Sequence, residues 1–411
     1  MKKRIFSFTT LLLMIPVLLI TACSQQKQRD ITGVYRGVLH SPGGDLAFPI
    51  TINKNNGSYT GYVTNGADTV KFTSVVLKGD SLHMNFNFYD SHIDAKIGPK
   101  GNLTGRWHKR YVENTQRVMK FTAAKGVKER YPRSSSDTKV FNGQWPTVFE
   151  NSSGHTYNAT GEFYTKDHQL YGTFMTKSGD FRYLEGTYTD STLTLSTFDG
   201  AHAYLLKGKL QKDGTLKGKN YEYSSSAVSW TSHKGENQLP DPFKIEKIDP
   251  QHPKITFALK DLNGDTVRST DDQFKNKPIM LYIFGSWCPN CADEAHMLRQ
   301  MYNKYKNTDL RVVGVAYEYT DNYNTAVKLV KNYKKRFNIP WTLLVAGRNE
   351  ANIVKKTLPF IKNLYSYPTT YFSDTDHNIK FIHVGFYGPG TGAYYLKEKQ
   401  VFKEKLDSIT Q

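Results

Sequence analysis

The first half of the chain alternates apolar and polar residues over short stretches that Gly, Asn and Asp interrupt. Residues 51–63, for example, contain two alternating runs on either side of an Asn-Gly pair, which is the pattern of a β-hairpin. The pattern occurs twice, in residues 31–126 and in residues 141–235. Each copy is predicted to hold roughly eight short strands, spaced about 8–12 residues apart, in an antiparallel meander that forms a barrel or a sandwich.

Matching positions in the two copies indicate an internal duplication. The matched pairs are Gly33 with Gly143, Gly61 with Gly172, His92 with His202, and Gly105 with Gly218. Gly33 and Gly143 are 110 residues apart, and Gly105 and Gly218 are 113 residues apart. Because the offset stays nearly constant, we expect the same fold twice.

From about residue 254 the pattern changes to predicted strands that alternate with predicted helices. The apolar runs 278–284 and 310–317 are separated by a helical stretch, residues 292–305. Strand–helix alternation predicts a sheet built from βαβ units. The expected fold class is therefore multidomain, with two duplicated antiparallel β units followed by an α/β domain.

Composition marks the expected domain boundaries. Residues 127–140 are polar and residues 236–253 contain four prolines, so both are predicted linkers. The predicted segments are 1–22 as a signal peptide, 23–30 as a tether, 31–126 and 141–235 as β repeats, and 254–411 as the C-terminal domain.

The N-terminus carries a targeting pattern. A basic start, Met1–Arg4, precedes the apolar run Leu11–Ile20, which is short for a membrane span. The run ends in Leu-Ile-Thr-Ala-Cys at Cys23, which resembles the bacterial lipobox and implies cleavage before Cys23 and lipidation of its thiol. Cleavage by an ordinary secretory peptidase near Ala22 is the alternative. We expect a lipid-anchored envelope protein in the outer membrane, facing the periplasm, with exposure at the cell surface as the alternative.

The chain is basic, with 55 Lys and Arg against 37 Asp and Glu and a net charge of +18. The densest basic run, residues 328–336, is interleaved with Val327, Val330 and Tyr333, so it predicts an amphipathic helix with a solvated basic face. We therefore expect no nucleic-acid partner.

The chain has three Cys, and two of them form Cys288-Pro289-Asn290-Cys291 between an apolar run and a helix. The N-terminus of a helix favours a thiolate, so Cys288 is placed to attack, and Cys291 lies one turn inside the helix. A zinc ribbon needs a second Cys pair, and a c-type haem site needs His where Ala292 stands. A redox-active pair is therefore predicted, with a structural disulfide as the alternative.

The histidines of the first half show no tight metal spacing along the chain, and we expect neither a metal nor a cofactor. These residues are His83, His92, His108, His155, His168 and His202.

Three features of the C-terminal domain belong together: residues 284–291, Glu294 and the segment Tyr367-Pro368-Thr369-Thr370. With them the domain resembles the TlpA/ResA-like branch of the thioredoxin superfamily, which implies that this α/β domain is thioredoxin-like. It implies that Cys288 attacks, Cys291 resolves, Pro368 is a cis-proline facing the dithiol, and Glu294 tunes the proton affinity of the cysteines. An ordinary solvated carboxylate is the alternative for Glu294. The implied lining residues are Trp287, Pro289, Tyr367 and Thr369.

Two positions depart from the family pattern. His296 stands where the family often has Pro, and Tyr282 stands where thioredoxin carries a buried acid. These departures leave Glu294 as the candidate for proton transfer.

The resemblance predicts an envelope thiol–disulfide oxidoreductase that reduces disulfides in exported proteins and is recharged by a membrane thiol electron donor. Two alternatives stay open. One is a ligand-binding lipoprotein whose β repeats capture a ligand, with the thioredoxin fold as an accessory. The other is a peroxiredoxin-like peroxidase.

Overall fold

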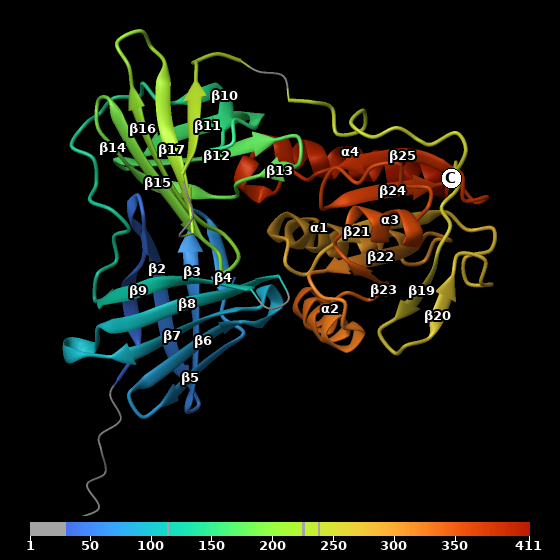
Figure 1. The fold of residues 1–411 in the computed structure, drawn as a ribbon, viewed down its shortest axis with the longest axis horizontal. Helices are drawn as coiled ribbons and strands as arrows, with labels where there is room; N and C mark the ends of the chain where they lie inside the picture. The colour runs from blue at the N-terminus through green and yellow to red at the C-terminus, as the bar shows by residue number, and fades with distance from the viewer. Residues whose placement is uncertain (1–29, 113–114, 224–226, 237–238) are drawn as a thin grey trace, which may run out of the picture.

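The computed structural model describes residues 30–112, 115–223, 227–236 and 239–411, with side chains undescribed at 111 and 112. Two β-barrels lie side by side, and an α/β domain lies against both (Figure 1). The predicted signal peptide and Cys23 fall outside the described residues. Within those residues, every helix is too short or too polar to cross a membrane.

The first barrel contains a closed ring of eight antiparallel strands. Hydrogen bonding runs β2-β1-β9-β8-β7-β6-β5-β3 and returns to β2, while β4 pairs with β3 at the side. The elements are β1 Gly33–Ser41, β2 Gly44–Asn55, β3 Ser58–Asn65, β4 Asp68–Lys71, β5 Ser74–Lys78, β6 Ser81–Phe86, η1 Asn87–Tyr89, β7 Ser91–Ile97, η2 Pro99–Gly101, β8 Leu103–Val112 and β9 Thr115–Lys125.

The second barrel repeats this topology. Its ring runs β11-β10-β18-β17-β16-β15-β14-β12 and returns to β11, with β13 beside β12. The strands are β10 Gly143–Glu150, β11 Thr156–Lys166, β12 Gln169–Thr176, β13 Gly179–Asp180, β14 Leu184–Tyr188, β15 Thr192–Phe198, β16 Ala203–Leu210, β17 Leu216–Glu222 and β18 Val228–Ser232. The prediction of two duplicated antiparallel units is confirmed, and both close as barrels.

Large side chains fill each barrel, which explains the alternating sequence. Trp107 and Phe121 are fully buried in the first barrel, as are Trp145 and Trp230 in the second. Gly218 has no side chain because a Cβ there would come within 2.2 Å of the Trp230 ring. Indole packing of this kind stabilises a barrel through burial of a large apolar area.

The segment between the barrels, residues 127–140, is largely exposed, but Arg130, Tyr131 and Ser134 in it are buried. Arg130 is 1% exposed. Its guanidinium donates to the carbonyls of Ala47 and Thr64 in the first barrel and of Ser196 in the second. A buried cation needs such partners, since desolvation without them is costly. Arg130 therefore joins the two barrels.

The α/β domain has a seven-stranded sheet in the order β20-β19-β23-β22-β21-β24-β25. Strands β21, β22 and β23 are parallel to one another, β24 runs antiparallel to β21, and β25 runs antiparallel to β24. Its elements are β19 Ala258–Asp261, β20 Thr266–Arg268, β21 Ile279–Phe284, α1 Pro289–Tyr305, β22 Arg311–Glu318, α2 Tyr323–Phe337, β23 Thr342–Arg348, α3 Ala351–Thr357, β24 Thr369–Ser373, β25 Ile379–Val384, η3 Pro389–Thr391 and α4 Ala393–Thr410.

Helices cover both faces of this sheet. Side chains of α1, α2 and α4 share a core with Tyr282 and Phe284, whereas Val354 of α3 packs with Leu281 and Ile283. Strand β21 is buried along its whole length, so it fixes the position of the loop that follows it at the carboxyl end of the strand. That loop leads into α1 and carries the two cysteines.

Candidate active site

The dithiol lies at the start of α1, between strand β21 and the helix. Cys288 is the N-cap residue, and its sulfur accepts a hydrogen bond from the Cys291 amide over 3.2 Å. Pro289 occupies the first helical turn, where its missing N–H costs nothing. Cys288 is 5% exposed and Cys291 is fully buried, and both are free thiols.

The two thiols have different environments. Burial, followed by the hydrogen bond and charge of Cys288, raises the pKa of Cys291 well above its ordinary value. A buried thiol of this kind stays protonated and inert until a base or a sulfur electrophile approaches. Cys288, in contrast, is the N-cap residue, so its sulfur lies at the positive end of the dipole of α1.

The loop before β24 faces Cys288. The Tyr367–Pro368 peptide bond is cis, as the resemblance predicts. The Cys288 thiol lies 3.4 Å from the Tyr367 carbonyl oxygen and can donate to it. Thr369 is buried and donates to the Ser366 carbonyl, which fixes the loop.

Trp287 borders the same loop. Its ring stacks on Tyr319 at 4.5 Å and meets Tyr367 edge-on at 5.3 Å. Its Nε1 donates to the Tyr317 carbonyl over 3.0 Å. The indole is therefore held beside the dithiol by β22 and by the cis-proline loop.

Glu294 points into the domain core from α1. It is fully buried and accepts a 2.6 Å hydrogen bond from the Thr370 hydroxyl, while its second carboxyl oxygen has no partner among the described residues. Burial raises the pKa of Glu294 to about 7. The alternative of a solvated helix carboxylate is therefore wrong.

Glu318 is a second buried carboxyl near the dithiol, and sequence reasoning did not find it. Its two oxygens accept from the Ser286 amide and hydroxyl, both over 2.9 Å. Burial raises the pKa of Glu318 to about 7. The available signal was its place at the end of a buried strand, because ends of parallel strands meet at one edge of a sheet.

Of the two departures from the family pattern, Tyr282 lies in the same core as the two cysteines, whereas His296 lies at the surface. Tyr282 is fully buried, and its hydroxyl accepts from the Trp341 indole over 3.4 Å. His296 is exposed and lines a cavity of about 430 Å³ between α1 and the barrels, together with Asp293 and Arg182.

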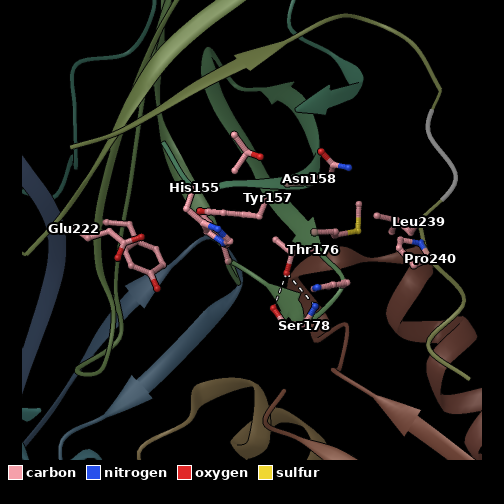
Figure 2. A pocket seen from close by; sticks show the side chains of 14 residues that line it. His155, Tyr157, Asn158, Thr176, Ser178, Glu222, Leu239 and Pro240 are labelled. Carbon is pink, nitrogen blue, oxygen red and sulfur yellow. Dashed lines mark hydrogen bonds between the residues drawn. The ribbon is translucent and has the colours of Figure 1, made fainter. Parts of the chain in front are cut away.

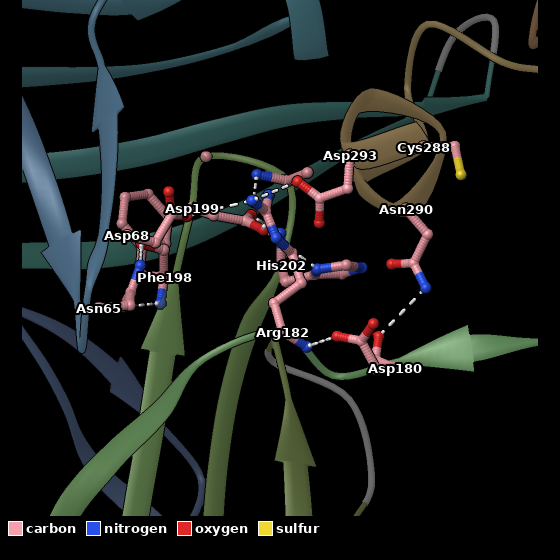
Figure 3. Close-up of polar contacts among 12 residues, drawn as sticks. Asn65, Asp68, Asp180, Arg182, Phe198, Asp199, His202, Cys288, Asn290 and Asp293 are labelled. Atoms are coloured by element: carbon pink, nitrogen blue, oxygen red, sulfur yellow. Dashed lines mark hydrogen bonds and ion pairs between the residues drawn. The ribbon is translucent and has the colours of Figure 1, made fainter. Parts of the chain in front are cut away.

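The second barrel contacts the helix that carries the dithiol, which the sequence did not predict. The Asn290 amide, between the two cysteines, lies 3.3 Å from the Asp180 carbonyl oxygen and 3.4 Å from that of Phe386 (Figure 3). The Asp180 carboxylate accepts from the Gly388 amide over 2.6 Å. The hairpin β12–β13 therefore borders the redox loop.

One buried arginine connects the three domains. Arg182 pairs with Asp68 of the first barrel at 3.1 Å, with Asp199 of the second at 3.3 Å and with Asp293 of α1 at 3.0 Å (Figure 3). Burial raises the pKa of Asp293 to about 7, although Arg182 opposes the rise. This cluster fixes α1 against both barrels.

The first barrel reaches the α/β domain through η1. The Arg336 guanidinium of α2 lies 3.6 Å from the Phe88 ring centroid. Tyr89 and Asp90 line a small cavity with Trp287 and Glu318. Both barrels therefore border the face of the domain on which the dithiol lies.

Among the described residues, one group of side chains lies close enough together to hold a metal ion. His92, Asp94 and His108, on the first barrel, have potential ligand atoms that all lie within 4.8 Å of one another. Their spacing along the chain concealed this group because they come from two different strands.

Comparison with known proteins supports the fold of the C-terminal part. Residues 250–382 match the model of the AhpC/TSA family. The chain is 24% identical over 155 residues to the thiol-disulfide oxidoreductase ResA of Bacillus cereus, covering 38% of this chain and 78% of ResA. It is 33% identical over 101 residues to the chloroplastic peroxiredoxin Q of Triticum aestivum, covering 24% of this chain and 41% of that protein.

Among solved structures, a DsbF homologue from Corynebacterium diphtheriae aligns with a TM-score of 0.31 and 20% identity, over 42% of this chain and 99% of its own. The family match falls on the domain that holds Cys288 and Cys291. The C-terminal part of this chain is therefore a thioredoxin-like domain of the AhpC/TSA family, homologous to ResA.

Proposed function

We propose that the protein is a thiol–disulfide oxidoreductase that reduces disulfides of other exported proteins through Cys288 and Cys291. The observation that carries the proposal is the position of the Cys288 sulfur. It lies at the N-terminus of α1 and 3.4 Å from the carbonyl oxygen that precedes cis-Pro368. An extended substrate segment bound along this loop would bring its disulfide to that sulfur.

The reaction would proceed by two exchanges. The Cys288 thiolate attacks one sulfur of the substrate disulfide, forming a mixed disulfide and releasing the first substrate thiolate, which takes up a proton. The Cys291 thiolate then attacks the Cys288 sulfur and releases the second substrate thiolate. Two electrons pass from the protein dithiol to the substrate, and Cys288–Cys291 becomes a disulfide until a membrane thiol donor reduces it.

We assign Glu294 as the group that accepts the proton of the Cys291 thiol. Its charge contributes to the raised pKa of Cys291, so the two groups affect one another across the domain core. A carboxyl with a pKa of about 7 can accept or return a proton near neutral pH. Glu318 would instead position Ser286, at the start of the redox loop.

Export and anchoring are part of the proposal. The lipobox-like sequence ending at Cys23 supports a lipid anchor, and it would place the dithiol among exported proteins at the outer membrane. Replacing Cys23 with Ala should release the protein from the membrane fraction or block its maturation.

The experiment is insulin reduction, measured with the full chain. Cys288→Ser should abolish reduction. Cys291→Ser should accumulate a mixed disulfide that mass spectrometry detects. Cys23→Ser is the matched control and should keep full activity in detergent. Undiminished reduction by Cys288→Ser would overturn the proposal, and faster turnover of hydroperoxide than of insulin would favour the peroxidase alternative.

Ligand capture by the repeats remains a second candidate because the second barrel has an open mouth. A cavity of about 680 Å³ is lined by Tyr157, Phe181, Tyr204 and Glu222, with Leu239 beside it (Figure 2). Its size and aromatic walls suit a small apolar ligand. Saturable binding of an anilinonaphthalene dye that Tyr204→Ala abolishes would support this candidate, and unchanged binding in that variant would count against it.

A further inference from the structure

A second group of side chains with potential chemistry lies on the outer surface of the first barrel. His92 of β7 pairs directly with His108 of β8, and Asp94 lies two residues farther along β7. His83 of β6 pairs directly with Asp94. Since side chains alternate between the faces of a sheet, all four lie on the same outward face, and each is partly exposed.

The atoms are close enough to share one ion. The His92 and His108 rings stack with centroids 4.9 Å apart, and His92 Nε2 lies 3.5 Å from Asp94 Oδ2. Zinc bonds of 2.0–2.1 Å in a tetrahedral site separate the ligand atoms by roughly 3.3 Å. Small rotations of these partly exposed side chains would close the remaining gap.

The hydrogen bonds around the group suit metal binding. Nδ1 of His108 is buried and has no hydrogen-bond partner among the described residues, so it forms no bond that would hold the ring in its present rotamer. His83 Nδ1 lies 2.7 Å from Asp94 Oδ1 and orients that carboxylate.

The second barrel provides an internal comparison. The cross-strand pair Ala95 and Gly105 corresponds to Gly208 and Gly218. Counting from these pairs, the residues equivalent to His92 and His108 are Leu205 and Tyr221, which also pair across their strands. Lys207 replaces Asp94. The strand pairing of the barrel therefore does not require imidazoles or a carboxylate here.

This register also corrects the alignment of His92 with His202. His202 precedes β16, and its Nδ1 lies 3.2 Å from the Asp199 carboxylate. It belongs to the buried cluster around Arg182 and has a different role from His92.

We propose that His92, Asp94 and His108 bind one divalent transition-metal ion, with His83 as a positioning residue for Asp94. Two imidazoles and one carboxylate suit zinc, nickel or copper, whereas Mg²⁺ and Ca²⁺ prefer oxygen ligands alone. Three protein ligands leave a fourth position for solvent or another molecule. The inference is independent of the redox function.

Zinc titration tests the site. The full chain carries Cys23→Ser, Cys288→Ser and Cys291→Ser so that thiolates do not bind the metal, and calorimetry measures the affinity for ZnCl₂. We expect one equivalent. The affinity should fall at least tenfold in His108→Gln and in Asp94→Asn, and His83→Ala should weaken it about tenfold, as loss of a residue that orients a ligand typically does.

His155→Ala is the matched control, because His155 is exposed on the second barrel, and it should bind zinc as the parent does. Circular dichroism checks that each variant is folded. Equal affinity in the parent and in folded His108→Gln, or no binding by the parent, would overturn the proposal.

Discussion

The two barrels share one topology but make different contacts with the redox loop. In the first, Asn65 pairs with Asp68, and in the second, Thr176 pairs with Gly179 at the same point of the hairpin. Three residues beyond Asp68 lies Lys71, which is exposed, whereas three residues beyond Gly179 lies the buried Arg182. The duplication reproduced the ring of strands, and a few residues in one side hairpin distinguish the barrel that contacts α1 most closely.

The comparison can be tested most strongly at Arg182. Arg182→Met leaves the carboxylates of Asp68, Asp199 and Asp293 without their shared cation. Removing one partner of a buried ion pair typically costs about 3–5 kcal/mol, so we expect a loss of that size in the free energy of unfolding at pH 7.5. Urea titration measures it.

Lys71→Met is the matched control, because Lys71 occupies the equivalent position and its side chain is exposed. It should change stability by less than about 0.5 kcal/mol, as surface substitutions do. Similar losses of stability in the two variants would mean that the side hairpins of the two barrels contribute equally to stability.

A second comparison is between two surfaces of α1. Asp293 lies on the surface that faces the second barrel, and Glu294 lies on the surface that faces the domain core. The pKa of Glu294 is raised from 4.5 to about 7, so the neutral carboxyl is favoured in the folded state. The protonation of Glu294 therefore stabilises the folded protein fully below pH 4.5, and this contribution is lost as the pH rises through 7. The shift in pKa corresponds to a change of at most about 3 kcal/mol in the free energy of unfolding.

Glu294→Gln should therefore unfold with a flatter pH dependence between pH 4.5 and 8 than the parent. Thermal unfolding across that range measures the effect. Glu404→Gln changes an exposed helical carboxylate and should leave the dependence intact. A parent and a Glu294→Gln variant with parallel pH profiles would show that the raised pKa of Glu294 is wrong.

The smallest expected effect is at Asp180, where the second barrel contacts the loop before α4. Its carboxylate accepts from the Gly388 and Arg182 amides. Asp180→Ala should cost about 1–3 kcal/mol, because two buried donors lose their partner. It should also speed alkylation of Cys288, since the contact with Asn290 loosens.

Thr69→Ala, at the equivalent position of the first barrel, should leave both stability and alkylation near the parent values. Mass spectrometry after a short pulse of iodoacetamide reports the labelled cysteine. Faster labelling of Cys291 than of Cys288, or equal rates in the two variants, would contradict the assignment of the covering hairpin.

The sequence was most informative where the signal is local. Residues 284–291 predicted the thiol loop and the start of α1, because a buried strand, a turn and a helix N-terminus follow one another directly along the chain. The pattern of short strands predicted two β units, and the cis bond at Pro368 followed from the family resemblance. Burial then decided between the two readings of Glu294.

Contacts between distant segments were not predictable in this way. The pairing of His92 with His108 depends on strand register, which the alternating pattern alone did not fix. The contact of Asn290 with Asp180 depends on how a barrel packs against another domain. Arg130 lies within the predicted polar linker, residues 127–140, and only the two barrels together show that its side chain is buried.

Arg130 also determines how access to the dithiol can change. Its guanidinium bonds to both barrels at once, and Phe198 and Leu205 of the second barrel belong to the core of the first. Separating the barrels would expose that core and leave a buried cation unpaired. The two barrels should therefore move as one body if they move relative to Cys288, and substitutions far from the sulfur should change how readily that movement occurs.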